Sequence, residues 1–297
     1  MDAIVLENKD VKVKHFDMPK IKKPDDILIK VKSVGLCKTD LMLSKGLLPC
    51  NEGQILGHEF SGITVEVGSQ VKNLKANDKV AVNPVLFLDD STYSDYQMLG
   101  IDQNGALTEY IIVPEKNVYK VPDQISFEVA AYLEPIAAAM SILNILFEKD
   151  KKVLIFGSGR IARLSHFILK TEGYTNIQTA EAIDQIGQSD MFDIIIENGI
   201  DNDKFNQLIK HLKIRGTFIL KSRHLKEVSF NGAEIIKKEI TLRGVNYGSF
   251  DDAYQFLINN HQYFNEFVGK SYPFDQYKTA FEDAINSDQY KQFINID

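Results

Sequence analysis

Hydrophobic and polar positions alternate along the first third of the chain. Ile27, Ile29 and Val31 alternate with Leu28, Lys30 and Lys32, a period of two that predicts a half-buried strand. Short apolar segments, separated by Gly, Asn, Pro and Asp, follow at residues 63–67, 79–82 and 109–113. This rhythm predicts a compact β domain that is partly rolled up. Residues 83–105 are irregular and acidic, and we expect them to form a surface excursion.

The pattern changes after Pro122. Residues 126–133 suit a helix that stops at Glu134 and Pro135. Pro135 can open a second helix as its first residue, because a missing N–H is tolerated there. We expect that helix to continue over residues 136–147.

Strand, turn and helix patterns alternate from Lys152 onward. An apolar run at 153–156 precedes a glycine turn and a helix, and further strands are predicted at 176–180, 192–196, 216–220 and 240–245. Such alternation is typical of a parallel sheet with helices on both faces, an α/β architecture. The tail from Asp251 reads as mainly helical. We expect a catalytic domain of residues 1–136 and 249–297, a cofactor domain of residues 137–248, and an active cleft at their junction.

The glycine turn has the spacing of a dinucleotide-binding motif, G-x-G-x-x-A. Gly157 permits the tight turn, Gly159 lets the backbone approach a pyrophosphate, and Ala162 lets helix and strand pack closely. We expect these three residues and Ile161 to bind the cofactor. Glu181 follows the next predicted strand, where a carboxylate can bind both ribose hydroxyls and repel a 2′-phosphate. The pattern favours NAD over NADP. A structural glycine turn beside a surface glutamate is the alternative.

Composition narrows the class of partner. The formal net charge is 34 − 41 = −7, without a compensating basic stripe, which argues against nucleic acid or an anionic membrane as a partner. Two cysteines cannot make a disulfide framework, so a reduced, cytoplasmic setting is expected. We see no secretory signal pattern and no apolar run of the ~20 residues that a membrane helix needs.

Residues 57–71 match every fixed position of the pattern G-H-E-x2-G-x5-G-x2-V. Here the chain resembles the zinc-dependent alcohol dehydrogenases of the medium-chain dehydrogenase/reductase family. Further segments resemble this family at residues 34–40, 77–80, 105–110 and 133–135, the last being similar to the sorbitol and polyol dehydrogenase branch. The resemblance implies a GroES-like β-rich catalytic domain, a Rossmann-type NAD domain, a small-molecule alcohol substrate and a homo-oligomer.

The same resemblance implies a catalytic zinc site. Cys37 and His58 would supply two ligands, and Glu59 and Glu134 compete for the third, since catalytic zinc takes about three protein ligands and one open position. Zinc with one thiolate, one imidazole and one carboxylate is formally neutral, whereas a second carboxylate would oppose its action as a Lewis acid. We therefore expect one glutamate as an inner ligand and the other to act through water or by exchange. Which glutamate is which stays open.

Three neighbours of Cys37 complete the expected site. Thr39 would pass the substrate proton toward the cofactor ribose and solvent, or be a simple turn hydroxyl. Asp40 resembles the carboxylate that orients the zinc-bound histidine, although it could equally cap a helix. Lys38 could reach the cofactor pyrophosphate, or be a solvated lysine.

Two departures from the family pattern matter. No cysteine lies between Val82 and Gly105, so the structural zinc of most relatives is expected to be absent, leaving one catalytic zinc. Only residues 182–191 separate Glu181 from the next predicted strand, too few for the usual helix, strand and helix, so the Rossmann domain should be shortened.

These observations favour a zinc- and NAD-dependent dehydrogenase of a polyol, sugar alcohol or sugar-phosphate secondary alcohol. A catalytically impaired relative that serves as a binding or assembly module is the second reading, and the shortened sheet is its only support. A zinc-free quinone or enoyl reductase of the same fold is the third, and the retained metal-binding residue types argue against it.

Overall fold

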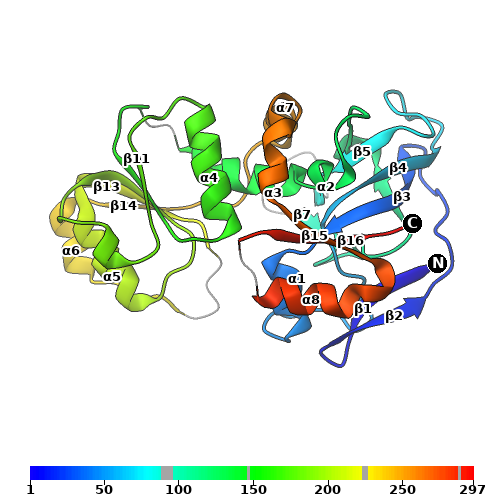
Figure 1. Cartoon of the computed structure of the whole chain (residues 1–297), viewed down its shortest axis with the longest axis horizontal. Helices are drawn as coiled ribbons and strands as arrows, with labels where there is room; N and C mark the ends of the chain where they lie inside the picture. Colours follow the sequence, from blue (N-terminus) through cyan, green and yellow to red (C-terminus); the bar gives the residue numbers. More distant parts are fainter. Residues whose placement is uncertain (88–95, 146–147, 223–226, 287–288) are drawn as a thin grey trace. The chain divides into compact units, whose positions relative to one another are not determined.

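Two separate stretches of the chain build the first unit of the structure, a computed structural model that describes residues 1–297 except 88–95, 146–147, 223–226 and 287–288 (Figure 1). This unit comprises Met1–Pro135 and Phe250–Asp297, and the second comprises Ile136–Ser249. The sequence predicts boundaries at 136/137 and 248/249, and the contacts divide the chain at 135/136 and 249/250.

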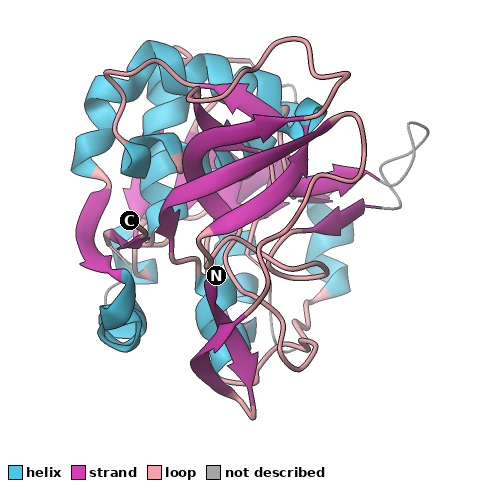
Figure 2. Cartoon of the chain, turned by 90° about the vertical axis from the view of Figure 1, so that its right-hand side faces the viewer, coloured by secondary structure: helices cyan, strands magenta, loops and turns pink. Residues whose placement is uncertain are grey.

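A mixed sheet forms the centre of the first unit. Its strands run in the order β15 (Val268–Pro273), β16 (Lys291–Asn295), β3 (Asp26–Gly35), β4 (Glu59–Val67), β5 (Lys79–Val82) and β9 (Val118–Lys120), and β8 (Tyr110–Pro114) also pairs with β3. Figure 2 shows these strands as a curved sheet. The strands predicted around Ile27 and at 63–67, 79–82 and 109–113 correspond to β3, β4, β5 and β8, so this part of the prediction is confirmed.

Two hairpins form separate two-stranded sheets. The first joins β1 (Asp2–Glu7) to β2 (Asp10–His15), and the second joins β6 (Val85–Phe87) to β7 (Tyr96–Met98). Residues 83–105 are expected to form an irregular surface excursion. This is wrong for the two strands of the second hairpin, which are regular and end at the buried Met98. Its acidic middle, residues 88–95, lies outside the described residues.

The helices around Pro135 differ from the prediction. In place of one helix over 126–133, α2 covers only Phe127–Ala130, and α3 (Leu133–Met140) begins two residues before Pro135. A proline fits there because the first four N–H groups of any helix lack an intrahelical partner. The predicted continuation to residue 147 is also wrong, since a 3₁₀ turn (Ser141–Asn144) follows Met140, and 146–147 lie outside the described residues.

The early end of α3 has a local cause. Ser141 Oγ donates to the Ala138 carbonyl at 2.7 Å, and the Gly248 N–H donates to the Ala137 carbonyl at 2.8 Å. These carbonyls would otherwise accept the next hydrogen bonds of the helix, so the side chain and a distant backbone group compete with its propagation.

The second unit contains a five-stranded parallel sheet. Its order is β11 (Ile177–Ala180), β10 (Val153–Phe156), β12 (Phe192–Glu197), β13 (Leu212–Leu220) and β14 (Thr241–Gly244). Alternate residues of β10 enter two hydrophobic clusters, one with Phe205 of α5 (Asn202–His211) and one with Ala162 of α4 (Arg160–Thr171). Helices thus cover both faces of the sheet, as the alternating pattern predicts. A further helix, α6, spans Gly232–Lys238.

This parallel sheet is shortened at one edge. After β11 only a 3₁₀ turn (Ile183–Gln185) precedes β12, and β11 is the last strand on its side. The predicted loss of a helix, a strand and a second helix after Glu181 is confirmed.

The tail corrects a further expectation. It contains α7 (Phe250–Asn260), a 3₁₀ segment (His261–Glu266) and α8 (Tyr277–Asn286), but also β15 and β16. Because β16 pairs with β3, opposite Ser33–Gly35, the two ends of the chain share one sheet (Figure 1). The tail is therefore not mainly helical. In the part of the chain that the structure describes, no helix is both long and apolar enough to cross a membrane.

Candidate metal centre and dinucleotide turn

The pairing of β3 with β4 brings two distant segments of the sequence together. Gly35, the last residue of β3, pairs with Glu59, the first residue of β4. Cys37 follows β3 by two residues and immediately precedes helix α1 (Lys38–Ser44), while His58 immediately precedes β4. Residues about twenty positions apart in sequence thus converge at one end of this strand pair.

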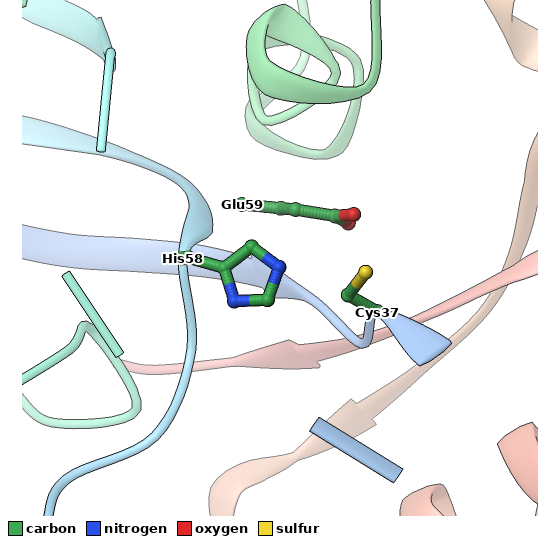
Figure 3. Close-up of side chains that lie close together, drawn as sticks. All are labelled: Cys37, His58 and Glu59. Carbon is green, nitrogen blue, oxygen red and sulfur yellow. The ribbon is translucent and has the colours of Figure 1, made fainter. Parts of the chain in front are cut away.

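Cys37, His58 and Glu59 form a group whose ligand atoms all lie within 4.8 Å of one another. Figure 3 shows one ring nitrogen of His58 and the Glu59 carboxylate facing the same region as the Cys37 sulfur. Among the described residues, no other three His, Cys, Asp or Glu side chains are grouped in this way. A thiolate, an imidazole and a carboxylate form a donor set typical of catalytic zinc.

Asp40 lies behind His58 and is fully buried. It accepts hydrogen bonds from the Cys37 N–H at 2.9 Å and the Gly57 N–H at 3.2 Å, so it ties α1 to the segment that carries His58. His58 Nδ1 lies 3.6 Å from Asp40 Oδ1 and has no hydrogen-bond partner in the described structure. This geometry leaves Nε2 as the nitrogen for a metal, with Asp40 placed to orient the ring from behind.

The charges around the His58 ring favour a proton on it. Burial lowers the pKa of the ring, but the negative charges of Asp40, Cys37 and Glu134 outweigh burial and raise that pKa to about 10. Burial also raises the pKa of Asp40. A cation bound beside Nε2 would replace this proton as the positive charge of the cluster.

Lys291 of β16 contributes a charge that the sequence analysis missed. Its Nζ contacts Glu59 Oε2, and both side chains are almost completely buried. Gly35 leaves room for this pair, because a Cβ there would lie 2.8 Å from both Glu59 Oε2 and Lys291 Cδ. Lys291 lies in no sequence motif. A lysine is usually exposed, so its burial could not be expected from the sequence.

The remaining predicted residues of this centre occupy different positions. Glu134 is buried in the first turn of α3, outside the three-residue group, although its charge acts on His58. Thr39 Oγ1 lies 3.7 Å from the Cys37 sulfur. Lys38 is exposed at the start of α1.

The glycine turn of the second unit fits a dinucleotide pyrophosphate. Gly157 has φ +127°, a backbone conformation that favours glycine, and a Cβ there would lie 3.1 Å from Asn198. Gly159 is the N-cap of the twelve-residue helix α4 and makes no side-chain capping bond. Gly159 has no side chain that could cap the first N–H groups of α4. A helix N-terminus favours an anion. Ala162 is buried against the sheet, and Ile161 is half-buried beside it.

Glu181 is exposed directly after β11, and its N–H donates to Gln185 Oε1 at 2.8 Å. One row of residue pairs crosses the sheet just before its carboxyl edge: Ala180, Phe156, Glu197, Leu220 and Gly244. Glu181 and Gly157 follow this row on adjacent strands. No sequence motif marks Glu197 or Asn198, which lie on the other side of β10.

Comparison with known proteins places both units in one architecture. Residues 23–123 match the model of the alcohol dehydrogenase GroES-like domain. The chain is 32% identical to (R,R)-butanediol dehydrogenase of Bacillus subtilis over 58% of its own length and 55% of that protein. It is 25% identical to D-xylulose reductase of Saccharomyces cerevisiae, over 95% of this chain and 94% of that one.

Solved structures agree. The crystal structure of 2R,3R-butanediol dehydrogenase from Bacillus subtilis superimposes with a TM-score of 0.87 at 25% identity, covering 99% of each chain. These similarities confirm the predicted fold class, a GroES-like domain joined to a Rossmann-type parallel-sheet domain.

Proposed function

We propose that this chain, which belongs to the alcohol dehydrogenase family of medium-chain dehydrogenases/reductases, transfers a hydride between a polyol, sugar alcohol or sugar-phosphate secondary alcohol and NAD at a single zinc site. That it is an oxidoreductase acting on alcohols rests on its relatives, which are named as butanediol, xylulose and sorbitol enzymes. Zinc, the choice of NAD and the substrate class are our proposals.

One observation carries the proposal. The ligand atoms of Cys37, His58 and Glu59 lie within 4.8 Å of one another, and Asp40 stands behind the histidine. The buried Nδ1 of His58 faces Asp40 Oδ1 at 3.6 Å, which is where a carboxylate that orients a metal-bound histidine ring would lie. This supports a metal site more strongly than a packed core histidine.

Each residue then has a defined task. Cys37, His58 and one glutamate would hold the zinc, which when bound acts as a Lewis acid that lowers the pKa of the substrate hydroxyl. Thr39, beside the Cys37 sulfur, would take the hydroxyl proton and pass it toward the cofactor ribose. Glu59 is the glutamate that lies in the ligand group, and its ion pair with Lys291 keeps Glu134 as the alternative inner ligand.

The second unit would hold the cofactor. The N-terminus of α4 would bind the pyrophosphate of NAD, with Gly157 and Gly159 allowing a close approach of the backbone. Glu181 would accept hydrogen bonds from the two ribose hydroxyls and disfavour the 2′-phosphate of NADP. Lys38 stays a candidate for a contact with the pyrophosphate.

A substrate screen with metal analysis tests the proposal. Purified protein is analysed for metal, then mixed with NAD and a panel of polyols and their phosphates while NADH absorbance is followed. We expect zinc in the protein and NADH from at least one polyol. Zinc-free protein that reduces quinones or enoyl compounds would instead support the zinc-free reductase, and zinc without NAD binding would support a binding or assembly module.

A further inference from the structure

A buried carboxylate joins two loops at the carboxyl edge of the parallel sheet. Glu197, the last residue of β12, is fully buried. It accepts hydrogen bonds from the N–H groups of Gly199, Lys221 and Ser222, each at 2.9 Å. The Ser222 hydroxyl lies 2.7 Å from Oε2 and 3.0 Å from Oε1. One side chain thus connects the turn after β12 to the first two residues after β13.

This connection lies at the point where a dinucleotide would cross the sheet. Strand order reverses at β10, since β11 lies on one side of it and β12 on the other, and ligands of such sheets bind at this switch point, outside the carboxyl ends of the strands. The residues that follow the last paired row are, in strand order, Glu181, Gly157, Asn198, Lys221 and Val245.

The order of these residues assigns the two halves of the cofactor. Under the proposed function, Glu181 holds the adenosine ribose on the β11 side, and the turn at Gly157 holds the pyrophosphate. The nicotinamide half must then extend over the ends of β12 and β13, which are the two loops that Glu197 connects.

Asn198 gives an independent indication of a ligand on that side. Its Oδ1 and Nδ2 are both buried, and neither has a hydrogen-bond partner in the described structure. Buried polar groups without partners are uncommon and call for a functional explanation. Asn198 stands beside Gly157, so the unsatisfied amide marks this row as incomplete without a polar ligand.

We propose that Glu197 is a positioning residue for the nicotinamide half of the cofactor, acting through the backbone of Gly199, Lys221 and Ser222. The inference rests on the proposed function. A carboxylate suits the task because both of its oxygens accept and neither donates, so it can satisfy four donors at once. A glutamine amide of the same size would place an NH₂ group against some of these donors.

The test compares a complete and a truncated ligand. NADH binding is followed by nicotinamide fluorescence, and ADP-ribose binding, which lacks the nicotinamide, is followed by calorimetry. We expect Glu197→Gln to weaken NADH binding about tenfold or more, which is the effect of losing a charge-assisted hydrogen bond. The same variant should weaken ADP-ribose binding by less than about twofold. Glu148→Gln, the same change at an exposed carboxylate of the same unit, should alter neither.

A second pair of variants keeps the test decisive if Glu197→Gln fails to fold. Ser222→Ala removes only the hydroxyl donor and should weaken NADH binding about threefold, and Ser222→Thr should restore it. Equal losses of NADH and ADP-ribose affinity, or unchanged NADH affinity in folded Glu197→Gln, would overturn the positioning role. Wild-type protein that binds neither ligand would instead reject the proposed use of NAD.

Discussion

The ammonium group of Lys291 contacts the carboxylate of Glu59 inside the first unit, with only 4% and 3% of the two side chains exposed. One residue lies on β16 and the other on β4, and both strands flank β3. The pair therefore links the end of the chain to the segment that carries His58. It also places a positive charge next to a candidate zinc ligand.

The first prediction concerns this ion pair. Lys291→Met should lower the free energy of unfolding by about 3–5 kcal/mol, because it leaves the Glu59 carboxylate buried without its partner. Zinc should restore part of this stability, since a bound cation can neutralise Glu59. Urea unfolding with and without zinc measures both effects. Lys270→Met, at an exposed lysine on neighbouring β15, is the control, and equal stability of the two variants would contradict the prediction.

The second prediction separates the two cysteines. Cys37→Ala should lose bound zinc and dehydrogenase activity together, because it removes an anionic ligand. Cys50→Ala should lose neither, since Cys50 lies outside the ligand group found among the described residues. Metal analysis of both variants after dialysis gives the answer. We expect about one zinc per wild-type chain, and two tightly held ions would contradict the assignment of a single site.

The third prediction follows from the proton on His58. Its pKa in the metal-free protein, about 10, lies above the value of 6.5 for a free ring. The stabilisation from this proton is therefore fully present below about pH 6.5 and is lost as pH rises through about 10. Zinc must displace the same proton, so its affinity should rise over the same interval.

Two opposite trends are thus expected from one group. Metal-free stability is measured by urea unfolding and zinc affinity by competition with a chelator, both across this pH interval. His58→Gln should remove the fall in metal-free stability, while His15→Gln, at an exposed histidine, should preserve it. Metal-free stability that increases with pH in the wild type would show that His58 is neutral.

Local patterns explain why much of the fold could be predicted. Strands such as β5 and β10 have their apolar residues within four consecutive positions, and the turn at Gly157 is contained in six. The ligands Cys37 and His58 were also visible, because each lies in a short segment typical of the family. Periodicity and spacing are read within such windows, so they identify elements of this kind.

Features that depend on distant partners could not be predicted. Strand β16 has four consecutive buried residues without alternation, and its pairing with β3 and β15 is what distinguishes it from a helix end. The burial of Lys291 and the early end of α3 depend on contacts between segments far apart in the sequence. Glu197 was missed for the same reason, since its partners Lys221 and Ser222 follow a different strand.

The fourth prediction concerns the choice of cofactor. Glu181→Ala should weaken NAD binding by about 1.5–3 kcal/mol, the range for hydrogen bonds to a charged group. The variant should also discriminate less against NADP, because the carboxylate that repels the 2′-phosphate is gone. Titration of both cofactors against wild type, Glu181→Ala and the control Glu148→Ala measures this. A wild type that prefers NADP would contradict the role given to Glu181.

The last prediction addresses the shortened parallel sheet. Because β11 is the edge strand and only a 3₁₀ turn follows it, one wall that would cover the adenine is missing. Leaving ~80 Å² of apolar surface exposed would cost ~2 kcal/mol, or about thirtyfold in affinity. The pyrophosphate and nicotinamide contacts should persist, since the turn at Gly157 and the start of α4 are intact. We therefore expect weak but productive use of NAD, with a dissociation constant larger than that of relatives that keep the full-length sheet. Calorimetric titration with NAD beside a turnover assay on polyols tests this, and saturating NAD that gives neither heat nor turnover would favour the non-catalytic binding or assembly module.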